Sequence, residues 1–231
     1  VYLCRYARYM RPFAPYVIRD IPADNASYKR WALDSCTDVR ARGFWEPDIH
    51  AKLTAEGYQL FMTPRIGVRH ADTNRLPSIS QAAAHHALAS CDTRTSAVPC
   101  ELDDRSSYRV PGAHRPSGMI GQESLKNPRL SVIVACTHSR LDLELVLSSL
   151  RGQEGADGLE IIVVDSSGDE AANQSIVQDE GVLTLRFPRG TPLPALWGAG
   201  IRQSRGAIIA VTDACSVPDR RWVLSTQAAH E

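Results

Sequence analysis

The chain has 231 residues, and its 26 Lys and Arg residues balance its 26 Asp and Glu residues, so the formal net charge is zero. A protein that holds nucleic acid or anionic lipid through electrostatics needs a surplus of basic residues, so this balance argues against a polyanion partner. With 43% hydrophobic and 23% charged residues, the chain has the composition of a globular protein with one large domain or two small ones.

The sequence predicts no membrane-spanning segment. Its longest apolar runs, Val132 to Cys136 and Ile161 to Val164, are far shorter than the roughly 20 residues that cross a bilayer. Residues 1–8 contain neither a secretion signal nor an initiator Met, so we expect that the chain begins inside a longer protein. The six Cys residues have no metal-ligand spacing, which favours reduced thiols in the cytoplasm, with a Cys91–Cys100 disulfide as the alternative.

Composition divides the chain into three zones, which are residues 1–70, 71–128 and 129–231. The middle zone has few large aliphatic residues, and so little apolar surface cannot offset the entropy of ordering, so we predict a largely disordered linker. Within it, the Ala-rich stretch 80–90 favours a short helix. His85 and His86 would point about 100° apart on that helix and have no acidic neighbour, which favours solvated histidines over a metal site.

The last zone alternates aliphatic runs with helical patterns. The runs predict strands at residues 130–136, 160–164, 182–187 and 207–212, and the patterns between them predict helices at 141–150, 170–179 and 195–203. Continuous aliphatic strands that alternate with helices are typical of an α/β fold, in which helices cover both faces of a mainly parallel sheet.

Polar residues follow these predicted strands at the ends where ligands bind in such sheets. Thr137 and Arg140 follow the first strand, Asp165 ends the second, and Asp213 ends the fourth. Asp165 suits a hydrogen bond to a ribose or base edge, and Asp213 suits a metal-linked or phosphate-linked role. The alternative is that each Asp caps the helix that follows. The dinucleotide fingerprint, the Walker loop and the nucleophile elbow are all absent from the sequence.

The last zone contains five short motifs, which follow one another along the predicted strands and helices. They are Ser131–Arg140, Leu150–Gln153, Glu160–Asp169, Gly200–Ala210 and Thr212–Pro218. In this order they resemble the nucleotide-binding half of family-2 glycosyltransferases, which implies a GT-A, Rossmann-like fold. The resemblance also implies a nucleotide-diphosphate sugar as the donor, bound at Thr137, Arg140, Asp165 and Asp213, with Asp165 on the nucleoside.

The same resemblance implies a metal site. In the family, an Asp-x-Asp motif at the position of residues 213–215 holds the divalent ion, Mn²⁺ or Mg²⁺, that bridges the diphosphate. Here Asp213 is retained, but Cys215 replaces the second carboxylate, and a soft thiolate is poorly matched to these hard cations. His70 falls where some relatives place a metal-binding histidine, with a solvated strand-end histidine as the alternative.

The first zone resembles a different part of the same family, the smaller α+β half on the acceptor side. The matching segments are Asp24–Arg30, Gly43–His50, Lys52–Gly57 and Pro64 with Val68–His70. This half normally follows the metal motif, so its order in the chain is reversed. We therefore interpret residues 1–70 as an acceptor-side half, 71–128 as a linker and 129–231 as a nucleotide-sugar-binding half.

Two carboxylates in the first zone are candidates for the catalytic base. Transfer with inversion needs a carboxylate that takes the proton of the acceptor hydroxyl, and the resemblance favours Glu46, with Asp48 second. The alternative is a structural role, because Pro47 suits the first turn of a helix and both carboxylates favour the positive end of the helix dipole.

These patterns predict a glycosyltransferase that moves a sugar from a nucleotide-diphosphate donor to a hydroxyl of a saccharide or lipid-linked saccharide. The chain would act as a fragment of a two-domain enzyme or as a permuted domain. The main alternative is a non-catalytic nucleotide-binding remnant, and a protein-interaction domain is the third hypothesis. We expect no nucleic-acid partner and a cytoplasmic location, with association at the cytoplasmic face of a membrane as the alternative.

Overall fold

The computed structural model describes residues 14–19, 21, 25–40, 43–70, 127–137, 140–168 and 181–231, and for Val39, Arg40, His70 and Arg140–Asp142 it describes the backbone only. We refer to residues 14–70 as the N-terminal segment and to residues 127–231 as the C-terminal segment. Several predicted features lie outside the described residues, namely most of the linker 71–128, the Ala-rich stretch 80–90, His85 and His86, Cys91 and Cys100, and the helix at 170–179.

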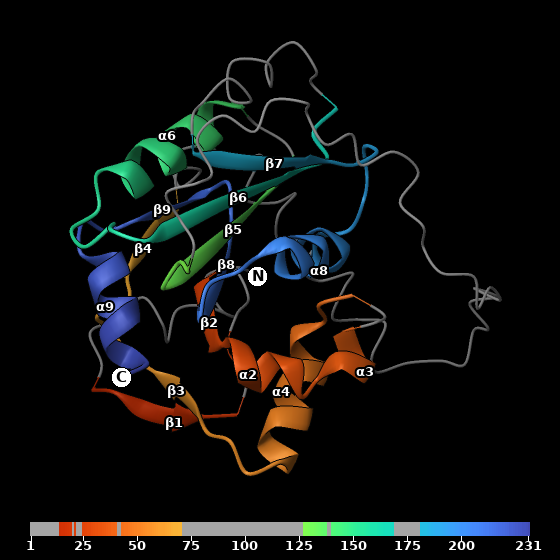
Figure 1. Ribbon diagram of the computed structural model, residues 1–231, viewed down its shortest axis with the longest axis vertical. Coiled ribbons are helices and arrows are strands. Elements are labelled where there is room, and N and C mark those ends of the chain that lie inside the picture. Colours follow the sequence, from red (N-terminus) through yellow and green to blue (C-terminus); the bar gives the residue numbers. More distant parts are fainter. Residues whose placement is uncertain are drawn as a thin grey trace, which may run out of the picture. The chain divides into compact units, whose positions relative to one another are not determined.

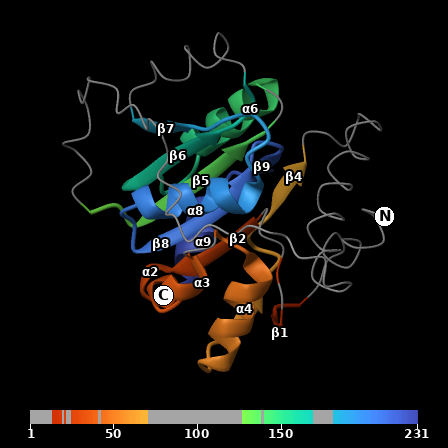
Figure 2. The same ribbon diagram turned by 90° about the vertical axis from the view of Figure 1, so that its right-hand side faces the viewer.

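The C-terminal segment forms the parallel part of a five-stranded sheet, in the order β2-β8-β5-β6-β7 (Figures 1 and 2). Its parallel strands are β5 (Leu130–Cys136), β6 (Leu159–Asp165), β7 (Val182–Arg186) and β8 (Ile208–Asp213). Buried β-branched and aliphatic residues fill the three central strands, because these strands are covered on both faces. The predicted α/β fold with a mainly parallel sheet is therefore confirmed.

Three helices in the described part of the C-terminal segment cover the sheet, α6 (Arg140–Arg151), α8 (Leu193–Gln203) and α9 (Trp222–Ala229). Helix α8 begins two residues earlier than the pattern predicts, because Pro194 fits the first helical turn, where a backbone N–H is not needed. Among the described helices, none combines the length and the hydropathy that crossing a membrane requires.

The N-terminal segment contains short elements of both kinds. Its strands are β1 (Tyr16–Ile18), β2 (Asn25–Lys29), β3 (Leu60–Met62) and β4 (Val68–His70), and its helices are α2 (Arg30–Asp34), α3 (Thr37–Arg40) and α4 (Glu46–Ala55). Strands β1 and β3 form an antiparallel ribbon, and β4 forms a second ribbon with β9 (Ser216–Pro218). The predicted α+β character of this segment is therefore confirmed.

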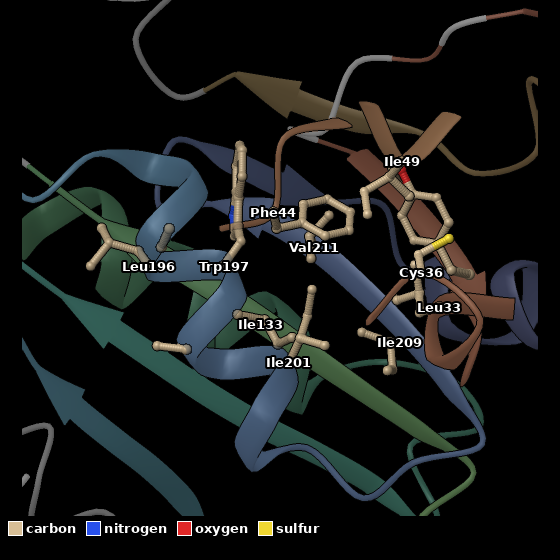
Figure 3. Packing of buried hydrophobic residues seen from close by; sticks show 14 of the residues in the cluster. Leu33, Cys36, Phe44, Ile49, Ile133, Leu196, Trp197, Ile201, Ile209 and Val211 are labelled. Carbon is tan, nitrogen blue, oxygen red and sulfur yellow. The ribbon is translucent and has the colours of Figure 1, made fainter. Parts of the chain in front are cut away.

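Two hydrophobic cores lie on opposite faces of the sheet. Along β5, Ile133 packs into one core, whereas its neighbours Val132 and Val134 pack into the other, as the alternation of strand side chains requires. The second core contains apolar residues of α6 and α9. The first core combines apolar residues of both segments (Figure 3), including Leu33, Cys36, Phe44, Ile49, Leu196, Trp197, Ile209 and Val211.

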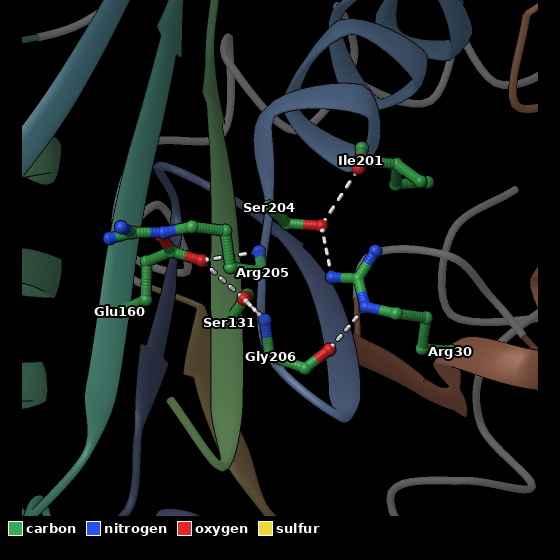
Figure 4. Close-up of polar contacts among 7 residues, drawn as sticks. All are labelled: Arg30, Ser131, Glu160, Ile201, Ser204, Arg205 and Gly206. Carbon is green, nitrogen blue, oxygen red and sulfur yellow. Dashed lines mark hydrogen bonds and ion pairs between the residues drawn. The ribbon is translucent and has the colours of Figure 1, made fainter. Parts of the chain in front are cut away.

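A buried carboxylate ties the amino ends of the parallel strands together (Figure 4). Glu160 has only 7% of its side chain exposed, and it accepts hydrogen bonds from Ser131 Oγ at 2.6 Å and from the backbone N and Nε of Arg205, both at 2.8 Å. Ser131 Oγ accepts a further bond from the Gly206 N–H at 2.7 Å. Only glycine fits there, because an added Cβ would lie 2.6 Å from Ser131 N.

A histidine at the C-terminal end of α9 makes the stability of the fold sensitive to pH. A hydrogen bond of 2.9 Å joins His230 Nε2 to Ser27 Oγ, and burial, with a smaller effect of the Lys29 charge, lowers the pKa of His230 from 6.5 to about 4. Above pH 6.5 the imidazole is neutral in both states. Between pH 6.5 and 4, only the unfolded chain takes up the proton, so folding loses stability as the pH falls.

We expect the wild-type free energy of unfolding to fall by about 2 kcal/mol more than that of His230→Gln between pH 7 and pH 4, after allowance for the exposed part of the ring. Urea titrations of both proteins at the two pH values measure this difference. Carboxylates also titrate in this range, but they do so in both proteins. Equal losses in the two proteins would show that His230 has no such effect.

Candidate functional site

The strand ends place two of the predicted aspartates on either side of β5. Asp165 ends β6 and pairs with Cys136, the last residue of β5, whereas Asp213 ends β8 and pairs with Ala135. Thr137 follows β5 between them and is half-buried. Parallel pairing thus brings all three residues to one edge of the sheet, which we call the carboxyl edge.

The two aspartates make the same local turn. Asp165 Oδ1 accepts the Ser167 N–H at 2.9 Å, and Asp213 Oδ1 accepts the Cys215 N–H at 3.0 Å. Asp165 is buried, whereas Asp213 is partly exposed. After Asp213 the chain enters β9 rather than a helix, so the helix-capping alternative does not apply to this residue. Both carboxylates are held by short-range contacts in defined orientations at the carboxyl edge.

The start of α4 comes to the same edge through a contact between the two segments. Helix α8 runs back across the sheet after β7, so its first residues lie at the carboxyl edge. There, Pro194 O accepts the Phe44 N–H at 2.9 Å, just before α4 begins at Glu46. Glu46 and Asp48 both lie in the first turn of α4, where the helix dipole stabilises negative charge. Glu46 is half-buried and Asp48 is exposed.

The predicted metal ligands come together only in part. Strand β4 pairs with β9 so that His70 lies opposite Ser216, the residue after Cys215. The backbone of His70 therefore runs beside the turn of residues 213–215. Within the described part of the chain, however, no group of three His, Cys, Asp or Glu residues is arranged to hold a metal ion. With one carboxylate and one thiol, these residues do not complete the oxygen-rich site that Mg²⁺ or Mn²⁺ prefers.

Two buried hydroxyls near these turns have no hydrogen-bond partner among the described residues. Ser166 Oγ follows Asp165, and Ser216 Oγ follows Cys215, and the two serines are 1% and 0% exposed. Buried polar groups are nearly always hydrogen-bonded, so such groups call for an explanation.

An arginine that sequence reasoning missed lies beside the Asp165 turn. Gly168 has a φ of +76°, and a Cβ built on it would lie 3.4 Å from Arg189 Cδ. Arg189 is exposed and belongs to the loop after β7. No local pattern relates positions 168 and 189, because only the parallel pairing of β6 with β7 brings the two loops together. Its guanidinium provides positive charge near the carboxyl edge.

A second feature absent from the predicted site is a buried aromatic pair below Glu46. His50, at 1% exposed, lies one turn after Glu46 on α4, and a hydrogen bond of 2.7 Å joins its Nε2 to the Tyr28 hydroxyl. The two rings stack with centroids 5.9 Å apart. In the sequence, only the i, i+4 spacing of Glu46 and His50 indicates that these two residues lie on the same face of a helix. Arg140, a predicted nucleotide-binding residue, begins α6 one residue before the predicted helix at 141–150.

Comparison with known proteins matches the C-terminal segment. The family model described as Glycosyl transferase family 2 matches residues 131–231. Among solved structures, the chain is similar to the mannosyltransferase PcManGT from Pyrobaculum calidifontis in complex with GDP-Man and Mn²⁺. The identity is 24% and the TM-score 0.38, over 43% of this chain and 31% of that one. The present chain thus spans about a third of that protein's length. Among curated proteins, none matches the chain.

The match covers all five motifs that the sequence places in order, from the first strand to the turn with Asp213. The same residues form the parallel sheet and its carboxyl edge in the structure. Residues 131–231 of this chain are therefore similar to glycosyl transferase family 2, whose model they match.

Proposed function

We propose that this chain transfers a sugar from a nucleotide-diphosphate donor to a hydroxyl acceptor, with its two segments acting as one permuted domain. The observation that carries the proposal is the convergence at the carboxyl edge. Asp165 and Asp213 come from the C-terminal segment, and Glu46 comes from the N-terminal segment through the contact of Phe44 with Pro194. A donor site and a base would thus share one edge of the sheet.

In this proposal, Asp165 binds the nucleoside and Glu46 acts as the base. The acceptor oxygen forms a bond to the anomeric carbon while the bond from that carbon to the diphosphate oxygen breaks. Glu46 takes the hydroxyl proton, and the nucleoside diphosphate leaves with the bonding electrons. The leaving group needs nearby positive charge, and two described arginines lie near Asp165, namely Arg189 beside its turn and Arg186 opposite it in the β6–β7 pairing.

A divalent ion would supply further positive charge at the diphosphate in this family, with Asp213 as the residue of this chain best suited to hold it. The thiol of Cys215 fits such an ion poorly. This disagreement favours the second candidate function, a non-catalytic nucleotide-binding domain, in which the donor's nucleotide binds without turnover. The acceptor of the enzyme version would be a saccharide or lipid-linked saccharide.

Turnover decides between the two candidates. The wild-type chain is incubated with UDP-linked and GDP-linked sugars, with and without saccharide acceptors, and release of the nucleoside diphosphate is measured. Release that depends on the acceptor supports the enzyme. A folded chain that binds UDP or GDP but releases nothing from any of these donors would support the non-catalytic domain instead.

Asp165→Asn is expected to weaken the binding of UDP or GDP by about 10-fold to 100-fold, because a charged hydrogen bond to the nucleoside becomes a neutral one. Isothermal titration calorimetry measures the change. Asp157→Asn is the matched control, because Asp157 is exposed in the loop before β6, at the opposite end of that strand. If Asp165→Asn binds as the wild type does, Asp165 does not contact the nucleoside.

Cys215→Asp is expected to make nucleotide binding depend on metal. We expect Mn²⁺ to change the affinity of the wild type for UDP by less than about 3-fold and that of the variant by about 10-fold or more, because carboxylate oxygen replaces a mismatched thiol. Cys215→Ser, which removes the thiol without adding a carboxylate, is the control. A strong Mn²⁺ effect in the wild type would contradict the mismatch.

A further inference from the structure

The N-terminal segment is joined to the C-terminal segment through residues 71–126, but it completes the fold through non-covalent pairing. Strand β2 adds to the open edge of β8, with Asn25 opposite Thr212 and Lys29 opposite Ile208. Strand β4 pairs with β9 in the same antiparallel sense. These two pairings are β-augmentation, a mode by which proteins also bind separate peptide segments.

Specific polar contacts surround the β2–β8 pairing. Arg30 Nε donates to Gly206 O at 2.6 Å, and Arg30 Nη2 donates to Ser204 Oγ at 2.9 Å (Figure 4). The backbone N–H of Arg30 also donates to Ala207 O at 2.8 Å. These three bonds join the start of α2 to the connection between α8 and β8. They fix the register at the end of β2.

The opposite end of β2 is fixed in a comparable way. Asn25 Oδ1 accepts the indole N–H of Trp222 at 3.0 Å, and Asn25 Nδ2 donates to Ile66 O at 2.9 Å. Between the two ends, Ser27 meets His230 at 2.9 Å. The contacts at Trp222 and His230 link β2 to α9, so the interface has polar anchors along the whole strand.

Apolar burial makes each segment dependent on the other. Phe44, Leu33 and Ile49 of the N-terminal segment are all 0% exposed, and they pack in one core with residues of α8 and β8 (Figure 3). Without the N-terminal segment, this face of the sheet and the backbone groups along the edge of β8 would meet water. Exposed edges of this kind pair readily with another chain.

We infer that the β8 edge is a docking surface for residues 14–70 that needs no covalent connection, and that a second copy of this chain can supply them. The exchange of an identical element between copies creates no new contacts, so it costs little. A connection within one chain raises the effective concentration of the segment to about the millimolar range, which favours the closed monomer in dilute solution. An exchanged copy would bring its own Glu46 to the carboxyl edge of its partner.

The test cuts the connection between the two segments in the folded 231-residue chain. A specific protease site is inserted within residues 71–126, an affinity tag is placed after residue 231, and the chain is cleaved under native conditions. We expect the untagged N-terminal piece to remain bound to the tagged C-terminal piece through affinity purification and gel filtration. Separation of the two pieces after cleavage would overturn the inference.

A mixing experiment tests the part played by a second copy. Cleaved, tagged chain is mixed with an equal amount of cleaved, ¹⁵N-labelled chain without a tag, and the masses of the bound N-terminal pieces are measured over time. We expect about half of the tagged complexes to carry labelled pieces at equilibrium, since the two kinds of piece compete equally. If no labelled piece is captured, a second copy does not supply the segment.

Arg30→Ala is expected to speed this exchange by about 10-fold, because it removes two charge-assisted hydrogen bonds across the interface. Arg65→Ala is the matched control, because Arg65 is exposed and its side chain makes no hydrogen bond or ion pair with the described residues. Equal exchange rates in the two variants would contradict the role of Arg30. These readouts need no enzymatic activity, so they are independent of the proposed function.

Discussion

The Glu46→Gln variant is expected to transfer sugar about 10²-fold to 10⁴-fold more slowly than the wild type, whereas Asp48→Asn is expected to remain within a few-fold of it. Both side chains lie in the first turn of α4, but Glu46 is half-buried and Asp48 is exposed to water. Glutamine keeps the size and shape of glutamate, but its neutral amide cannot accept the proton of the acceptor hydroxyl. The comparison therefore isolates the proton transfer from the stability of the helix.

Initial rates of acceptor-dependent release of the nucleoside diphosphate measure this effect. Calorimetric binding of UDP or GDP, expected to be unchanged in both variants, shows that the donor site is intact. If Asp48→Asn is the slow variant, the base is Asp48 and the preference for Glu46 is wrong. If both variants keep the wild-type rate, neither carboxylate is the base, and their common role is at the start of α4.

Trp197→Ala is expected to lower the free energy of unfolding by about 3–5 kcal/mol, the range observed when a large buried aromatic side chain is removed. Trp197 is 1% exposed and lies in the core that both segments share. Its indole N–H donates to Thr212 O at 3.0 Å, directly before Asp213. The substitution therefore leaves a cavity and also removes the hydrogen-bond donor of a buried carbonyl group.

Urea denaturation followed by far-UV circular dichroism measures the loss. Trp31→Ala is the control, because Trp31 is 55% exposed and its main aromatic contact is an edge-on one with Tyr58, so we expect a loss of about 1 kcal/mol or less. Trp197→Phe separates the two effects, since it retains most of the packing without the N–H, and we expect an intermediate loss. Equal losses for Trp197→Ala and Trp31→Ala would show that the shared core contributes little.

Much of the fold of the C-terminal segment could be predicted, because its signals are local. Residues 130–136 are apolar except for Ser131, so the run predicts one continuous buried strand. The structure has β5 with the same bounds. Asp165 and Asp213 could be placed at one edge for the same reason, since parallel strands end at the same side of a sheet. Arg189 could not be placed, because its approach to Gly168 depends on how two loops pack.

The sequence by itself predicted the four parallel strands of the C-terminal segment, its helices α6 and α8 and the identity of the candidate carboxylates. Hydrophobic periodicity and strand-end chemistry act over a few residues, so they can be read directly from the chain. Only the tertiary structure decided that β2 pairs with β8, that His70 lies opposite Ser216 and that Phe44 brings Glu46 to the carboxyl edge. These contacts join residues far apart in the chain through backbone hydrogen bonds and shared burial, which no local pattern specifies.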